Sequence, residues 1–158
     1  MHIRTFREGD APSLYQVFHS AIHLVAARDY TKEQIDAWAP PSMDADLWAQ
    51  RMRGIAPFVV EDNGIVLGYA DVQDSGYIDH FFVSGLHQGQ GTGRLLMEQI
   101  HQQAAKLGLE LLTSHVSKTA QPFYQRFGFH IVEHREPVAG GIVIPNALMH
   151  KRLKQEPA

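Results

Sequence analysis

Apolar residues that recur every three or four positions predict the helices of this chain. The pattern runs through 14–25 and again through 96–107, where Gly108 is expected to end the helix. Shorter helices are expected at three further places: 32–39, 45–52 and 119–127. Thr31 precedes the first of these and is expected to act as a plain N-cap, because Glu33 is off the capping-box spacing.

Runs rich in β-branched and aromatic residues predict the strands. The clearest pair is 57–62 and 65–73, because Asn63-Gly64 between two apolar runs is a strong signal for a hairpin. The next apolar run, 77–83, is expected to continue the sheet as a third antiparallel strand. Four further strands are expected: 2–6, 109–116, 130–138 and 142–153.

Length and composition fit one globular domain with its own core. The chain has 158 residues, of which 44% are hydrophobic and 20% are charged. The order of the predicted elements indicates a mixed α/β (α+β) sheet over 1–153, followed by a frayed tail at 154–158. Pro145 lies inside the last predicted strand and indicates an edge position or a bulge there.

Charge and cysteine content argue against several classes of function. The net charge of -3 gives no electrostatic reason to expect a nucleic-acid partner. The absence of cysteine excludes disulfides, thiolate metal sites and a cysteine nucleophile. The helical pair His19 and His23 has no acidic third ligand at an obvious spacing, so no metal is expected. No signal segment or membrane-spanning run is visible, and we expect a cytoplasmic protein that does not contact a membrane.

A glycine-rich loop separates the predicted strand 77–83 from the helix that follows it. Gly89, Gly91 and Gly93 allow positive φ and a close approach to a ligand, and successive amides at a helix N-terminus form a cradle for an anion. A plain strand-to-helix turn is the alternative. The Walker loop and the dinucleotide fingerprint, counted from Gly89, both require a glycine where Arg94 stands, so neither motif fits.

Two segments together resemble the GNAT superfamily, the Gcn5-related N-acetyltransferases. The loop sequence QGQGTG matches the family signature Gln/Arg-x-x-Gly-x-Gly/Ala, and 117–129, SKTAQPFYQRFGF, resembles its Asn-x-x-Ala-x-x-Phe-Tyr-x-x-x-Gly-Phe segment. The resemblance covers nearly the whole chain and is weakest over 27–56. It implies the GNAT fold, a mostly antiparallel twisted sheet that is flanked by helices and split by a V-shaped cleft for coenzyme A.

The resemblance implies acetyl-CoA as cosubstrate and direct attack of a primary amine on the thioester. The loop residues that it places on the CoA pyrophosphate are Gln88, Gly89, Gln90, Gly91, Thr92 and Gly93. Arg94 would add a cation, and Phe82 and Val83 would lie beside the thioester. Ser117 stands where many members have asparagine, so that contact to CoA is in doubt; its hydroxyl would otherwise cap the next helix.

The resemblance also points to residues that would move protons. Tyr124 matches the tyrosine that protonates the departing thiolate, although packing and orienting CoA is the alternative role. The glutamate position of the family falls on Tyr77, which is not basic. Asp79 lies two residues further on the same face of the strand and is expected to be buried. His80 has a pKa suited to a base, and an ordered water is a third candidate.

The acceptor is expected to be a small-molecule amine rather than a peptide amine, because nothing acidic and extended suggests docking of a basic tail. The resemblance places Tyr30 and Trp38 in one wall of the acceptor cleft, with Tyr77 as a further substrate contact; anchoring a helix to the core is the alternative for Trp38. A homodimer through the last strands is a further expectation. The rival function is a non-catalytic module that binds acyl-CoA.

Overall fold

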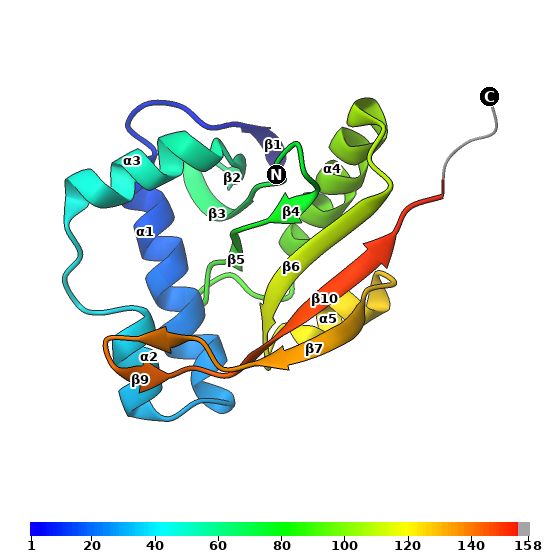
Figure 1. The fold of residues 1–158 in the computed structure, drawn as a ribbon. Helices are drawn as coiled ribbons and strands as arrows, with labels where there is room; N and C mark the ends of the chain where they lie inside the picture. The colour runs from blue at the N-terminus through cyan, green and yellow to red at the C-terminus, as the bar shows by residue number, and fades with distance from the viewer. Residues whose placement is uncertain (155–158) are drawn as a thin grey trace.

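The computed structural model describes residues 1–154, which contain both helices and strands (Figure 1). Most of the expected tail, at 155–158, lies outside the described residues. The α-helices are α1 (Ala11–Ser20), α2 (Lys32–Trp38), α3 (Ala45–Ile55), α4 (Thr92–Leu107) and α5 (Gln121–Arg126). A π-helical turn, η1 (Ala21–Val25), and a 3-10 turn, η2 (Ala26–Arg28), prolong α1. The strands are β1 (His2–Thr5), β2 (Phe58–Asp62), β3 (Ile65–Ala70), β4 (Tyr77–Ile78), β5 (Phe81–Val83), β6 (Leu111–Ser117), β7 (His130–Arg135), β8 (Val138–Ala139), β9 (Ile142–Val143) and β10 (Asn146–Arg152).

The strands form two four-stranded sheets that part in the middle of the molecule. One has the order β1-β2-β3-β5 and is antiparallel throughout. The other has the order β4-β6-β10-β7, in which β4 runs parallel to β6 and the remaining pairs are antiparallel. β8 and β9 form a separate hairpin. The expectation of a mixed, mostly antiparallel sheet is therefore confirmed.

The run 77–83 is not one strand, and that prediction was wrong. Its first part, β4, pairs with β6, whereas its second part, β5, pairs with β3 in the other sheet. Asp79 and His80 lie between the two parts and belong to neither strand. Because β5 leaves β6 at this point, the two sheets open into the V-shaped split that the GNAT resemblance implied (Figure 1).

Turn and cap residues account for two of the connections. Asn63 and Gly64 both have positive φ, 50° and 78°, as a two-residue hairpin turn requires, which confirms the β2–β3 hairpin. At α2, the Thr31 hydroxyl accepts the amide of Gln34 at 3.2 Å, and the Gln34 side-chain oxygen accepts the amide of Thr31 at 2.9 Å. This is a full capping box, so the expectation of a plain cap was wrong.

The last predicted strand is divided at Pro145, which lies between β9 and β10. β10 is a central strand between β6 and β7, so the expected edge position was wrong. A register shift does occur between Leu148 and Met149, three residues beyond the proline. Proline has no amide to donate, and placing it at the bend keeps the ladder of β10 intact.

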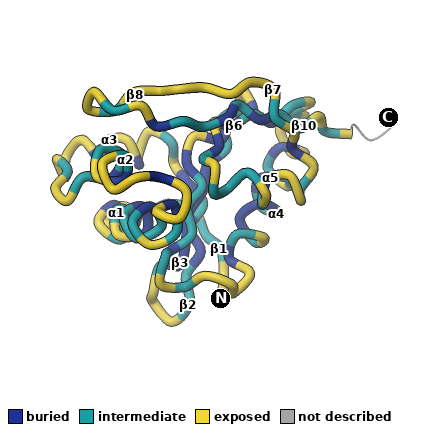
Figure 2. The backbone as a smooth tube through the Cα atoms, turned by 90° about the horizontal axis from the view of Figure 1, so that it is seen from below, coloured by how far each residue is buried: buried dark blue, intermediate teal, exposed yellow. Residues whose placement is uncertain are grey.

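The strands separate two groups of helices, each with its own core. Figure 2 shows α1, α2 and α3 on one side of the strands and α4 and α5 on the other, with the buried segments between them. The first core contains Leu14, Ile22, Met52, Val59 and Tyr69, and the second contains Leu96, Ile100, Leu112, Tyr124 and Met149. Burying each such side chain contributes roughly 1.5–3 kcal/mol. Within the described residues, no helix is both long and apolar enough to cross a membrane.

Candidate active site

The glycine loop presents amides that no protein group accepts. Gly89 and Gly91 have φ of 75° and 85°, a conformation that L side chains rarely adopt, and Gly91 immediately precedes α4. Within residues 1–154, no protein acceptor is found for the backbone amides from Gln88 to Arg94. The Gln88 side chain donates to the carbonyls of Val83 (3.2 Å) and Ser84 (2.9 Å), which ties the loop to the end of β5. The loop is therefore built as an anion cradle.

The first turn of α4 completes this cradle. Thr92 is buried, and its hydroxyl has no hydrogen-bond partner among the described residues. A Cβ at Gly93 would lie 3.2 Å from the Phe123 ring, so glycine lets α5 approach the helix start closely. Arg94 is exposed, and its guanidinium lies 6.0 Å from the centre of the Phe127 ring, beside the helix N-terminus.

The edge of β5 that faces the split carries free backbone groups. The carbonyl of His80 and the amide of Ser84 are bonded to β3, and Phe82 pairs with Tyr69 there. In an antiparallel ladder the alternate residues point the other way, so the backbone groups of Phe81 and Val83 face the split. The Val83 backbone therefore faces the split, whereas that of Phe82 turns into the sheet.

Tyr124 lies at the root of the split, on α5. Its ring is buried against Phe81 and Phe129, at centroid distances of 5.7 and 5.0 Å. Its hydroxyl is within hydrogen-bonding reach of Ser114, whose own hydroxyl donates to the Ile78 carbonyl at 2.9 Å. Burial raises the pKa of Tyr124 far above its ordinary value, so the hydroxyl keeps its proton at neutral pH.

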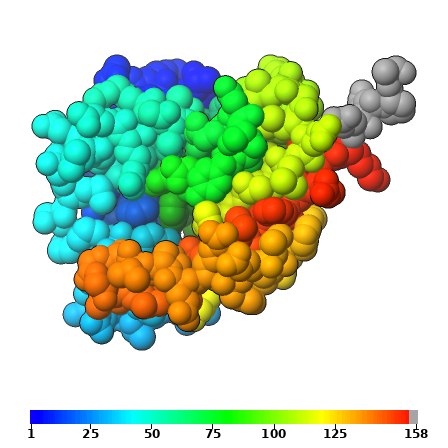
Figure 3. Space-filling model, viewed as in Figure 1, coloured from blue at the N-terminus to red at the C-terminus, as the bar shows by residue number. Residues whose placement is uncertain are grey.

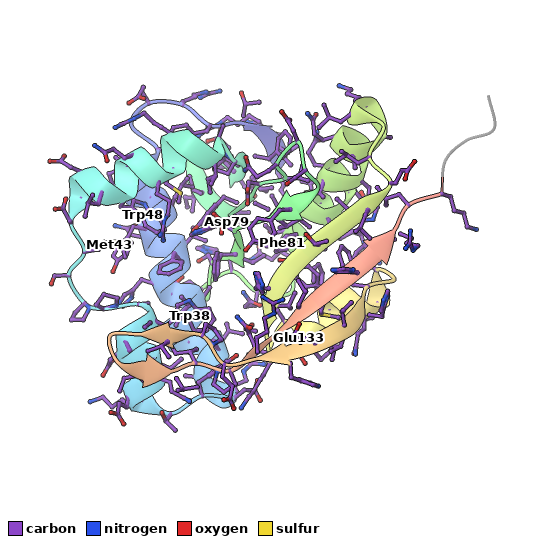
Figure 4. All side chains as sticks on the ribbon, in the orientation of Figure 1. Trp38, Met43, Trp48, Asp79, Phe81 and Glu133 are labelled. Carbon is purple, nitrogen blue, oxygen red and sulfur yellow. The ribbon has the colours of Figure 1, made fainter. Side chains whose placement is uncertain are left out.

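Asp79 is exposed, and the expectation that it would be buried was wrong. The strand alternation on which that expectation rested does not apply, because Asp79 lies in the break between β4 and β5. Its carboxylate makes no hydrogen bond or ion pair with the described residues, while its amide donates inward to Asp71 at 3.0 Å. Figure 4 shows Asp79 next to β4, on the side of the molecule that carries α3 and Trp48.

His80 is buried and neutral. Burial lowers the pKa of its imidazole to about 4, and nearby Asp79 offsets only part of this shift. Its Nδ1 lies 3.0 Å from the hydroxyl of Tyr69, which is itself fully buried. A buried tyrosine hydroxyl needs an acceptor, so we assign the Tyr69 O–H as the donor to Nδ1 and place the imidazole proton on Nε2.

Asp71 is the residue that the sequence reasoning missed. It follows β3 directly and is buried, with 1% of its surface exposed. Its carboxylate accepts the amides of both Asp79 and His80, and burial raises its pKa to about 6. An acidic residue closing the apolar run IVLGYAD was the available signal, because a buried carboxylate requires hydrogen-bond partners.

The three predicted acceptor contacts occupy different places. Tyr30 is buried; its hydroxyl donates to the Pro145 carbonyl at 2.5 Å and accepts the Lys118 amide at 3.0 Å, so it joins distant segments. Trp38 is half-buried, with its ring 5.6 Å from Tyr30 and 6.4 Å from Phe82. Tyr77 lies on β4, beside β6.

The Tyr77 hydroxyl lies 3.0 Å from Nδ1 of His115 on β6, so this tyrosine belongs to the parallel β4–β6 pair. Ser117 ends β6, and its hydroxyl accepts the Ala120 amide at 3.3 Å in the turn before α5. Ala120 is the N-cap of α5 and no side chain caps this helix, so the capping alternative was wrong. His19 and His23 stack at 3.9 Å, and His23 donates to the Ala39 carbonyl at 2.7 Å. Among the described residues, no three His, Cys, Asp or Glu side chains are grouped so that they could hold a metal.

Aromatic rings pack together between the break at His80 and the helices α1 and α3. The Phe18, Trp48 and Phe82 rings each lie within 6 Å of the His80 ring. Figure 3 shows a hollow in this face, where α1, the β4–β5 segment and the β8–β9 hairpin meet. Figure 4 shows Trp38 and Trp48 on the α1 side of that region. The aromatic side chains and the split therefore meet at the break that carries Asp79 and His80.

Comparison with known proteins agrees with this architecture. The family model of the acetyltransferase (GNAT) domain matches residues 26–151. The uncharacterized N-acetyltransferase YafP of Escherichia coli is 27% identical over 149 residues, which cover 94% of each chain. The L-amino acid N-acyltransferase MnaT of Escherichia coli is 28% identical over 156 residues, which cover 89% of this chain and 85% of MnaT.

Solved structures share the fold closely. The GCN5-related N-acetyltransferase from Rhodopseudomonas palustris described as "Aminotransferase, Class-II" superposes with a TM-score of 0.91 at 26% identity, covering 96% of this chain and 95% of that one. The putative acetyltransferase yncA of Salmonella typhimurium, solved with acetyl-CoA, has a TM-score of 0.70 at 20% identity, covering 100% and 96%. The chain therefore belongs to the GNAT acetyltransferase family, a family of acyltransferases.

Proposed function

We propose that this acyltransferase moves the acetyl group of acetyl-CoA to the primary amine of a small molecule. The observation that carries the proposal is the run of backbone amides from Gln88 to Arg94, which have no hydrogen-bond acceptor among the described residues. This run follows the strand that borders the split. A pyrophosphate supplies acceptor oxygens and negative charge, which suit both the amides and the N-terminus of α4. The yncA structure, solved with acetyl-CoA on the same fold, supports this choice of ligand.

The rest of the cosubstrate fits the split between β5 and β6. The backbone groups of Phe81 and the amide of Val83 face away from β3 and are available to the amide groups of a pantetheine arm, whereas the Val83 carbonyl already accepts the Gln88 side chain. The same edge can stabilise an oxyanion, because amides there are fixed by the ladder before any reaction starts. Ser117 is engaged in its turn and is a weaker candidate for a contact to CoA.

The reaction is direct acyl transfer. The amine nitrogen attacks the thioester carbonyl, a carbon–nitrogen bond forms, and the carbon–sulfur bond then breaks to release CoA thiolate. Tyr124 donates a proton to that thiolate, since its hydroxyl is protonated at neutral pH and lies at the root of the split. Phe81, whose ring packs on Tyr124, links this position to the strand that holds the thioester.

Asp79 is our candidate for the group that receives the ammonium and its proton, directly or through water. Its carboxylate is exposed and makes no hydrogen bond to the described residues. His80 is the weaker candidate, because its pKa of about 4 and the proton assigned to Nε2 make it a hydrogen-bond donor at neutral pH. A neutral imidazole N–H beside Asp79 suits the carbonyl oxygen of an acceptor or of the thioester.

The β8–β9 hairpin favours a small acceptor. The Gln34 side chain donates to the Val143 carbonyl at 3.0 Å, and Tyr30 donates to Pro145, so the hairpin is fastened over α2. The fastened hairpin borders the hollow in Figure 3, and we therefore favour a compact acceptor over an extended chain. Relatives act on both kinds of amine: MnaT is an L-amino acid N-acyltransferase, and YiaC of Escherichia coli, 27% identical over 104 residues, is a peptidyl-lysine N-acetyltransferase.

The test measures release of CoA thiol from acetyl-CoA with a panel of amino acids, aryl-alkyl amines, polyamines and lysine peptides. We expect at least one free small amine to accelerate release above the amine-free rate, and lysine peptides to be poorer acceptors. Acceleration by peptides alone would contradict the preference for small molecules. Calorimetric titration should show acetyl-CoA binding well above ATP or NAD, and equal or tighter ATP binding would refute the assignment of the loop.

Tyr124→Phe tests the acid. With an amine that the wild type acetylates, we expect kcat to fall by about tenfold or more, because the proton transfer is lost. The Kd of CoA should stay within about threefold of the wild-type value, because the loop is untouched. Ser114→Ala is the companion variant, since it removes the neighbour of the tyrosine hydroxyl but not the hydroxyl itself. A Tyr124→Phe enzyme with unchanged kcat would remove the proposed acid role.

A further inference from the structure

The break between β4 and β5 is a bulge of one residue. The Asp71 amide donates to the His80 carbonyl at 3.1 Å, and the Gln73 amide donates to the Tyr77 carbonyl at 2.8 Å. Between these two bonds the register shifts by one residue, which leaves an extra residue on the β4–β5 side. Such a bulge bends its strand and turns amides out of the ladder, so those amides need another acceptor.

One buried oxygen accepts both of these amides. Asp71 Oδ1 lies 3.0 Å from the Asp79 nitrogen and 2.6 Å from the His80 nitrogen. The second oxygen, Oδ2, accepts the Gln73 side-chain amide, which also donates to the Ile55 carbonyl at the end of α3 at 3.3 Å. The carboxylate is thus fixed from both sides and lies below the surface, so it is not placed to touch an acceptor itself.

We propose that Asp71 is a positioning residue for the transfer reaction: its carboxylate clamps the amides of Asp79 and His80, and so fixes where Asp79 lies and where β5 parts from β6. The inference rests on the proposed function of this site. Without the clamp, two amides of the bulge lose their acceptor, which favours a rearranged bulge. A shift of a reacting group by about 1 Å can lower a rate roughly hundredfold.

The pair Asp71→Ala and Asp71→Asn separates clamping from mere folding. Asparagine keeps an Oδ1 that can accept both amides, whereas alanine has no acceptor. With the accepted amine, we expect Asp71→Ala to lower kcat by about tenfold or more and Asp71→Asn to restore it to within about threefold of the wild type. The Kd of CoA from calorimetry should change less than about threefold in both variants, because the loop amides are remote from the clamp.

The matched control is Asp74→Ala, an exposed aspartate in the same β3–β4 turn, which should leave kcat and Kd unchanged. Wild-type kcat in Asp71→Ala would overturn the inference, and so would an Asp71→Asn enzyme as impaired as the alanine variant. If Asp71→Ala does not fold, Gln73→Ala replaces it. That variant frees the carboxylate on one side only and should lower kcat about threefold at constant Kd; an unchanged kcat would contradict the clamp.

Amide hydrogen exchange tests the clamp without any turnover. We expect the amides of Asp79 and His80 to exchange at least about tenfold faster in Asp71→Ala than in Asp71→Asn, beyond any change in global stability. If Gln73→Ala replaces the alanine variant, Oδ1 still accepts both amides, so we expect a smaller increase of about threefold over the wild type. Equal exchange in the compared variants would refute the inference. If no amine is acetylated by the wild type, the proposed function fails while this measurement still decides the clamp.

Discussion

Asp71 and His80 are both buried and are joined through the His80 backbone amide, and their side chains respond to acid in opposite directions. Burial raises the pKa of Asp71 from 3.8 to about 6 and lowers the pKa of His80 from 6.5 to about 4. The carboxyl binds its proton more tightly in the folded state, so its contribution to stability is complete below pH 3.8 and is lost as the pH rises through about 6. The imidazole contribution is present above pH 6.5 and is lost as the pH falls through about 4.

The two contributions nearly cancel in the wild type. Each shift exceeds 2 pK units, and one unit corresponds to about 1.4 kcal/mol, so each group contributes about 3 kcal/mol over its whole window. When the pH falls from 7 to 4.5, Asp71 raises the free energy of unfolding by about 2 kcal/mol, and His80 lowers it by between about 2 and 3 kcal/mol. Removing either group should expose the pH dependence of the other.

The assay is urea unfolding at pH 7 and pH 4.5, followed by tryptophan fluorescence; the Trp48 ring lies 5.9 Å from that of His80. Between pH 7 and pH 4.5, the free energy of unfolding of Asp71→Asn should fall by about 2 kcal/mol more than that of the wild type. That of His80→Phe should fall by between about 2 and 3 kcal/mol less than that of the wild type. Differences between two pH values cancel the constant cost of each substitution. The reasoning would be refuted if both variants showed the same change in unfolding free energy between the two pH values as the wild type. It would also be refuted if both differed from the wild type in the same direction.

Three further substitutions test the packing that holds the site. Thr31→Ala removes half of the capping box with Gln34 and should lower the unfolding free energy by about 1 kcal/mol in urea titrations. Gly68→Ala places a Cβ 2.9 Å from the Phe82 carbonyl, so a loss of roughly 1–3 kcal/mol and weaker CoA binding in calorimetry are expected. Trp48→Phe removes the indole donor to the Ala11 carbonyl at 2.8 Å and should cost about 1–3 kcal/mol in the same titrations.

Features that depend on neighbouring residues could be predicted from the sequence. The Asn63-Gly64 turn, the end of α4 at Gly108 and the amide-bearing loop before α4 all depend on backbone freedom at particular residues. The capping box was missed by one position, because Glu33 was tested against the spacing and Gln34 was not. The V-shaped split came from the family resemblance, since no local pattern encodes it.

The break at Asp79 could not be predicted by the same means. Tyr77, Ile78, Phe81, Phe82 and Val83 form an apolar run whether they serve one sheet or two, so the alternation says nothing about the interruption. The interruption is hydrogen-bonded to Asp71, which lies eight residues before Asp79 and directly after β3. Once the bulge is known, the exposure of Asp79 follows, because its amide and not its side chain faces the carboxylate.

Tyr30 shows why the acceptor side is harder to predict than the cosubstrate side. The sequence places it in the cleft wall, yet its hydroxyl joins the Pro145 carbonyl to the Lys118 amide. These partners are 115 and 88 residues away, so no spacing rule connects them. The loop proposed to bind the cosubstrate is one segment, whereas the hollow proposed for the acceptor lies where α1, the β4–β5 segment and the β8–β9 hairpin meet. Acceptor specificity should therefore change most when the contacts that fasten these segments change, which makes Tyr30 and Gln34 the positions to vary first.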